Sequence, residues 1–269
     1  ARPNLNFTIG KQFVNFGGYE YYVNSIRVRE FSEFNNLLTA YQAGISGNWQ
    51  VSPDHELCFQ IVNNRNGNDE DIYPTGLPEG TAKAKIPFMY TVNWNSYYLD
   101  KALQLRYATA VGQQTRKRYS YYFTCGNTYE KGPLLTYLDV MYTRQGIDQH
   151  GVVSRLPGTP HTAMNTEYLS IIGDVDYRVH PQWNVYVKGA YETARVYKSN
   201  GDFRKGMYRR SWNAQSSVEF FPFKQLDLFV FVLYTYRGVI LEKAARRMGA
   251  IEPDTHRISL GLVYSIPVF

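Results

Sequence analysis

The stretch RRSWNAQSSVEF, residues 209–220, carries two different surfaces on alternate residues. One set of positions is polar throughout: Arg209, Ser211, Asn213, Gln215, Ser217 and Glu219. The positions between them are more apolar: Arg210, Trp212, Ala214, Ser216, Val218 and Phe220. Because successive side chains of a β-strand point to opposite faces, this period of two predicts a strand with one polar face and one mainly apolar face.

The same period recurs along most of the chain, as in PFMYTVNWN (87–95) and LRYATAVGQ (105–113). We predict about twelve strands, each about ten residues long, which is the length of a barrel strand that crosses a bilayer at a tilt. The expected strands span residues 3–10, 37–48, 56–64, 86–96, 103–112, 119–130, 134–144, 167–179, 183–196, 207–221, 226–237 and 255–266. One short helix is expected in LEKAARRMGA, residues 241–250, which contains good helix formers.

The connections between these strands alternate between short and long. Short ones are expected at residues 52–55, 97–102, 131–133, 180–182 and 222–225. Longer, polar ones are expected near residues 65–85, 113–118, 145–166, 197–206 and 238–254. This asymmetry is typical of bacterial outer-membrane barrels, which have short periplasmic turns and longer outside loops. A soluble barrel with one elaborated end is the alternative.

The composition is compatible with a membrane barrel. Aromatic residues make up 16% of the 269 residues, and the mean hydropathy is −0.40. Such a low average does not exclude a barrel, because its lipid-facing and lumen-facing residues alternate and cancel. No apolar run reaches the length of about 18 residues that a transmembrane helix needs. The net charge of +6 is spread along the chain without a nucleic-acid module, so we expect no nucleic-acid partner.

Aromatic residues near the expected strand ends add to the membrane interpretation, because Tyr and Trp collect at membrane interfaces. They are Tyr97, Tyr98, Tyr119, Tyr121, Tyr122, Trp183, Tyr197, Tyr208 and Phe221. The chain ends in SIPVF, and a terminal aromatic such as Phe269 looks like the signal by which bacterial assembly machinery recognises barrels. We therefore predict an all-β fold: one transmembrane antiparallel β-barrel domain over residues 1–269, located in the cell outer membrane as a multi-pass barrel.

Two stretches near the start, GKQFVNFGGYEYYVNS (10–25) and EFSEFNNLLTAYQAGI (30–45), resemble the porin O/P family of phosphate-selective porins, especially members from the Bacteroidota. Weaker similarities lie in GNTYEKGPLLTYLDVMYTR (126–144) and ISLGLVYSIPVF (258–269). The resemblance implies a general diffusion or anion-preferring porin of sixteen strands, commonly a homotrimer. It also implies that residues 11–36 are an outside loop that folds inward and constricts the pore.

In that family the constriction loop follows the fifth strand, whereas here it follows the first recognisable one. The resemblance therefore implies about twelve visible strands out of sixteen, with the N-terminal strands of a complete porin absent. A barrel of twelve strands that closes by itself is the alternative, because the strand number is even.

Charges that line a narrow pore decide which ions pass. The expected constriction residues are Lys11, Arg27, Arg29, Glu30 and Glu33. Strand alternation places six further cations on the pore lining: Arg106, Arg178, Lys188, Arg209, Arg237 and Arg257. Arg suits phosphate or carboxylate because its planar guanidinium binds oxyanions in bidentate fashion. As an alternative, these cations could pair with acids on the same faces as structural braces. Those acids are Asp139, Asp174, Asp176, Glu192, Glu219 and Asp227, together with Glu20 of the loop.

The dense lysine cluster of the phosphate-specific family members is missing, since Lys11 is the only lysine between residues 10 and 36. Catalysis and metal binding are not expected. The chain has no HExxH, GxSxG or Gly-rich phosphate motif and no ligand cluster for a metal. Cys58 and Cys125 are far apart and form no metal or redox motif. We expect no cofactor.

The sequence thus predicts an outer-membrane porin for passive diffusion of small hydrophilic solutes, with anion preference as an open possibility. The expected partners are outer-membrane lipid and small anions or other small solutes. A homo-oligomer, such as a trimer, or membership of a larger outer-membrane complex is also expected. The alternative function is a structural or scaffold barrel with a plugged lumen, and a barrel enzyme is a third hypothesis that we do not favour.

Overall fold

The computed structural model describes residues 4–22, 31–36, 41–64, 73, 75–82, 84, 85, 87–149, 151–156, 158, 161–223 and 228–264. These residues form one antiparallel sheet of twelve strands, which lie side by side in chain order from β1 to β12. Within the described residues, β1 and β12 are the two edges of this sheet and no ladder joins them. The predicted all-β fold is therefore confirmed.

Every strand overlaps one of the twelve predicted spans. The strands are β1 (Leu5–Phe13), β2 (Tyr41–Ser52), β3 (His55–Asn63), β4 (Phe88–Tyr98), β5 (Leu103–Thr115), β6 (Arg118–Lys131), β7 (Leu134–Ile147), β8 (Met164–His180), β9 (Trp183–Val196), β10 (Gly206–Phe220), β11 (Leu228–Leu241) and β12 (Thr255–Tyr264). Among the described residues, four short helical turns accompany them: α1 (Tyr19–Tyr22), η1 (Glu33–Asn36), α4 (Val152–Arg155) and α5 (Lys243–Arg247). In the described part of the chain, no helix has the length and apolar character needed to cross a membrane.

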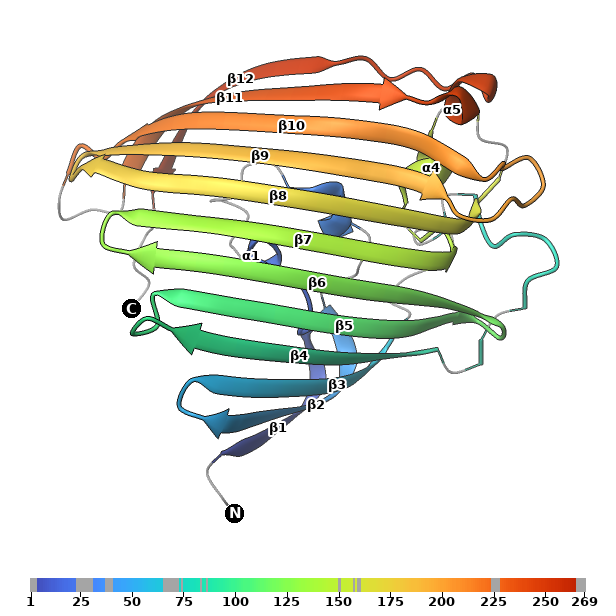
Figure 1. The fold of residues 1–269 in the computed structure, drawn as a ribbon, viewed down its shortest axis with the longest axis horizontal. Coiled ribbons are helices and arrows are strands. Elements are labelled where there is room, and N and C mark those ends of the chain that lie inside the picture. Colours follow the sequence, from blue (N-terminus) through green and yellow to red (C-terminus); the bar gives the residue numbers. More distant parts are fainter. Residues whose placement is uncertain are drawn as a thin grey trace.

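The sheet is strongly curved, and α1 and α4 lie on its concave side (Figure 1). The tight hairpin turns gather at the left end in that view. The long connections, with α4 and α5, gather at the right end. The predicted asymmetry of the two ends is therefore present, with one correction. Residues 113–118 do not form a long connection, because β5 continues to Thr115 and only Arg116 and Lys117 separate it from β6.

The two faces of the sheet differ in polarity as the opening stretch predicts. In β10, the polar side of Ser211 and Gln215 faces inward and is buried, whereas Trp212 on the outward side is 51% exposed. Outward-facing apolar side chains are exposed on most strands, including Val187 and Phe123. A polar interior with an apolar convex surface is the arrangement of a barrel in lipid, whereas a soluble protein buries its apolar face.

The short helix expected in residues 241–250 is present as α5, whereas α4 was not predicted. Several predictions lie outside the described residues, namely those for Arg27, Arg29, Glu30, Asp227 and the terminal Phe269. Strand β1 extends to Phe13, so the part of the chain that turns inward begins at Val14 and not at Lys11.

Candidate functional site

The connection between β1 and β2 runs along the inner face of the barrel. We refer to its described parts, residues 14–22 and 31–36, as the inward segment. Its main apolar contact is a cluster of three buried rings, in which Phe16 stacks on Phe34 with ring centroids 6.1 Å apart. Both rings meet Tyr122 of β6 edge-on, at centroid distances of 5.7 and 6.5 Å. Burying a large apolar side chain contributes about 1.5–3 kcal/mol, so this cluster holds both parts of the segment against the wall.

The pair Gly17–Gly18 allows the segment to touch the wall directly. Gly17 has a φ of +119°, a backbone conformation that favours glycine. A Cβ atom added to Gly18 would collide with the carboxylate of Asp139, and one added to Gly126 would lie 2.7 Å from the Cα of Gly18. Glycines on both sides of this contact therefore let the backbone of the segment lie on β6 and β7.

Asp139, a buried residue on the inner face of β7, binds the start of α1. Its two carboxylate oxygens accept hydrogen bonds from the backbone N–H groups of Tyr19 and Glu20, at 3.0 and 2.8 Å. The first N–H groups of a helix have no partner inside the helix, so a carboxylate from the wall satisfies them here. A helix of one turn is not stable in isolation, and this wall contact explains why it forms.

The side chain of Glu20 forms a buried ion pair with Lys188 of β9, whose side chain is 1% exposed. The same carboxylate accepts the backbone N–H of Ser32 at 2.9 Å, which joins the two parts of the inward segment. A buried pair of this kind adds little net stability, but removing one partner leaves an uncompensated charge and costs about 3–5 kcal/mol. The pair therefore fixes the position of the segment more than it stabilises the barrel.

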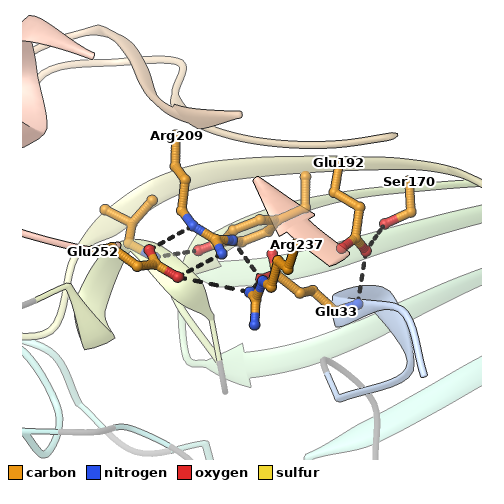
Figure 2. Close-up of polar contacts among 8 residues, drawn as sticks. Glu33, Ser170, Glu192, Arg209, Arg237 and Glu252 are labelled. Atoms are coloured by element: carbon orange, nitrogen blue, oxygen red, sulfur yellow. Dashed lines mark hydrogen bonds and ion pairs between the residues drawn. The ribbon is translucent and has the colours of Figure 1, made fainter. Parts of the chain in front are cut away.

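Glu33, at the start of η1, is the centre of a second network (Figure 2). Its carboxylate contacts the guanidinium groups of Arg209 and Arg237, from β10 and β11. Its backbone N–H donates to Glu192 of β9 at 2.7 Å, and Glu192 also accepts the hydroxyl of Ser170 at 2.9 Å. Four neighbouring strands thus hold one turn of the segment.

Arg209 also binds the connection between β11 and β12. Its Nε and Nη2 atoms each donate to a carboxylate oxygen of Glu252 at 2.7 Å, so the pair is bidentate. Bidentate pairs of arginine with a carboxylate are among the strongest hydrogen-bonded contacts in proteins. One guanidinium, almost completely buried, therefore joins the inward segment to a connection at the long-loop end.

The structure brings three of the six expected pore-lining cations onto the inward segment, where each contacts a carboxylate of that segment: Lys188, Arg209 and Arg237. Arg106 also faces inward, with its guanidinium carbon 4.1 Å from the ring centroid of Tyr22 in α1. Among the described residues, no carboxylate forms an ion pair with Arg106. Of the expected cations beside the segment, Arg106 is therefore the one without an ion pair to a described carboxylate.

The remaining expected residues lie elsewhere. Arg178 stacks on Phe221, 3.9 Å from the ring centroid, near the tight-turn end. Arg257 is opposite the buried Thr235 on the inner face of β12, away from the inward segment. Lys11 belongs to β1, on the same outward side as Phe7 and the 77% exposed Ile9.

Sequence reasoning missed several residues of this site. Gly18, Ser170 and Glu252 were not singled out, and Asp139 was considered only as an acid that could pair with a lumenal cation. The Gly-Gly pair inside an aromatic-rich stretch was a usable signal of close backbone approach. Within the described part of the chain, no group of three His, Cys, Asp or Glu side chains could hold a metal ion.

Comparison with known proteins agrees with this architecture. The sequence model of a family described as phosphate-selective porin O and P matches residues 2–266. The outer-membrane channel DcaP of Acinetobacter baumannii is similar in structure, with a TM-score of 0.64 and 13% identity over 97% of this chain and 72% of that one. A loop-deletion mutant of the outer-membrane protein OmpT of Vibrio cholerae has a TM-score of 0.58 and 13% identity, over 97% and 76% of the two chains. No curated protein sequence matches the chain.

Proposed function

Since the chain belongs to the phosphate-selective porin O and P family, it is an outer-membrane porin for passive diffusion of small solutes, and we propose that the inward segment sets the width of its pore. The observation that carries this proposal is the attachment of the segment to the inner wall at separate places. Asp139, Lys188 and the pair Arg209–Arg237 bind it from four different strands. A segment held in this way narrows the lumen permanently, so it limits the size of the solutes that pass.

We propose further that ion preference is weak and directed towards anions. Lys188, Arg209 and Arg237 face carboxylates and contribute little net charge to a passing ion. Arg106 is the cation beside the segment that supports anion preference, because its charge is not neutralised by a described carboxylate. In a narrow pore with low-dielectric walls, a single such charge acts strongly on a partly dehydrated ion.

Planar-bilayer recording tests both statements. The wild-type protein is expected to give an open, ohmic current with a reversal potential that indicates a mild preference for anions. Arg106→Glu is expected to shift that potential towards cation preference, whereas Arg116→Glu, in the outer turn between β5 and β6, is expected to change it much less. An unchanged reversal potential in Arg106→Glu would show that Arg106 does not determine the ion preference. A folded protein without any current would favour the scaffold barrel with a plugged lumen.

We also propose that the protein acts without catalysis and assembles as a homotrimer. The proposed absence of catalysis rests on the family and on the lack of a catalytic motif in the sequence. A related fold supports the proposed assembly, since OmpT of Vibrio cholerae is described in a trimer form. Cross-linking of the protein in native outer membranes, followed by denaturing electrophoresis, distinguishes a trimer from a monomer or from a complex with other proteins.

A further inference from the structure

A cavity of about 730 Å³ lies at the long-loop end of the barrel, above the ends of β10 and β11. One side is formed by α5 and the other by Asp202 and residues 204–208, at the start of β10. Gly158 closes part of it, and a Cβ atom at this position would collide with the carbonyl oxygen of Met248. The chain at Gly158 is therefore packed against the backbone of Met248, just after α5, without using the lining cations.

Four exposed cations surround this cavity: Arg204, Lys205, Lys243 and Arg247. None of the four forms an ion pair with another described residue. The two acids of the lining are both directed to other partners, since Glu242 pairs with Arg210 and Asp202 lies 3.9 Å from His161. The cavity thus presents cations that are not neutralised by its own carboxylates, which suits a ligand with more than one negative charge.

The cavity adjoins the outward wall of the barrel. Met207 in its lining pairs across the ladder with Arg195, whose side chain is 42% exposed and which lies opposite Glu167 on β8. Arg210, which binds the Glu242 of the lining, lies on the same side of β10 as Trp212. The cavity is therefore continuous with the lipid-facing wall through two arginines, each of which forms an ion pair with a carboxylate.

Just below these arginines, the outward wall becomes aromatic and apolar. Tyr191 and Trp212 pack with ring centroids 4.2 Å apart, and the exposed Val187 and Val218 lie farther along the outward faces of β9 and β10, towards the tight-turn end. Aromatic side chains of this kind mark the level of lipid head groups, and long outside loops mark the outer leaflet. An amphiphile with chains along this wall would place its head group at the cavity.

We propose that this cavity binds the phosphorylated head group of an outer-leaflet lipid. Arg204, Lys205, Lys243 and Arg247 contact the phosphates, while Arg195 and Arg210 form the border with the apolar wall. The apolar outward face of β9 and β10 favours a lipid over a free phosphate, because only a lipid also covers that face. This site is separate from the pore and makes no contact with the inward segment.

Equilibrium binding to the refolded full chain in detergent tests the proposal. The probes are lipid A with two phosphates, the same lipid with both phosphates removed, and inorganic phosphate. The double variant Lys243→Gln/Arg247→Gln is expected to bind phosphorylated lipid A about 30-fold more weakly, as expected for the loss of two cations near an anionic head group. The matched control Arg116→Gln/Lys117→Gln removes the same charge at the same end, and its affinity is expected to be unchanged.

Single-channel conductance of all variants is expected to equal that of the wild type, which shows that they fold and that the pore is not involved. Equal affinity for the lipid without phosphates would overturn the proposal, and so would an equal loss of affinity in the control variant. Displacement of lipid A by inorganic phosphate at low millimolar concentration would overturn it as well, because the cavity would then be a site for free anions.

Discussion

Single residues decide where the inward segment can lie. Gly18 has no side chain at the point where the segment meets the carboxylate of Asp139, and Asp139 in turn provides acceptors for α1. Neither Gly18 nor Asp139 contributes a free charge to the pore lining. Their role is to let the backbone of the inward segment lie directly against the strands of the wall. The segment therefore projects into the lumen by little more than its own thickness.

Gly18→Ala is expected to destabilise the folded protein by about 1–3 kcal/mol, because the new methyl group collides with Asp139 and forces the segment away from β7. Denaturant unfolding of the refolded barrel in detergent micelles, followed by tryptophan fluorescence, measures this change. Gly173→Ala is the matched control, since a Cβ atom there has no neighbour within 4 Å. Equal stability of the two variants would show that the contact with Asp139 is not tight.

At the level of elements, the strands and the inward segment differ in how they are encoded. The alternation of polar and apolar residues along a strand is a local pattern, because it relates each residue to those two positions away. The stretch RRSWNAQSSVEF could therefore be assigned to a strand from its own sequence. The contacts of the segment join residues far apart in the sequence, such as Glu20 with Asp139, 119 positions away, and Glu33 with Arg237, 204 positions away. No local pattern in the sequence contains such pairs.

The same reasoning explains which parts of the site could be predicted. The inward side of Lys188, Arg209 and Arg237 followed from alternation, but their carboxylate partners did not. Lys11 was expected in the constriction because it belongs to the stretch that resembles the porin family. In the structure it lies on the outward side, because β1 continues to Phe13. Strand ends depend on pairing with a neighbouring strand, here Phe13 with Tyr41, which a single sequence does not show.

The double variant Phe16→Ala/Phe34→Ala is expected to release the inward segment from Tyr122 and to raise single-channel conductance. Each substitution removes a fully buried ring, a change that costs about 3–5 kcal/mol, while the barrel strands remain paired. Phe7→Ala/Phe59→Ala, on the outward face, is the control and should leave conductance unchanged. Unaltered conductance in the first variant, with the protein folded, would mean that the segment does not limit the current.

For the whole molecule, the decisive property is the inversion of polarity across the sheet. The inner face carries ion pairs and buried polar groups, and the outer face carries exposed Val, Ile, Leu and aromatic side chains. Because the barrel places its apolar side chains on the outside, its stability depends on the surrounding lipid. A charged side chain is therefore expected to destabilise the barrel on its outer face and to be tolerated on its inner face.

Val187→Arg, on the outward face of β9, is expected to destabilise the barrel in lipid bilayers by about 2–4 kcal/mol, the cost of an arginine near the bilayer midplane. Asn213→Arg, on the inward face of β10, is expected to cost much less, since its side chain faces the polar interior. Reversible unfolding from vesicles in guanidinium chloride compares the two. A larger loss for Asn213→Arg would contradict the assignment of the two faces.

The guanidinium of Arg209 binds Glu33 of the inward segment and Glu252 of an outer connection at the same time. We therefore expect a displacement of that connection to reach the inward segment through one side chain. In an open channel, we expect such a linkage to appear as current noise. Contact with this connection at the cell surface is therefore expected to alter the current without opening or closing the pore.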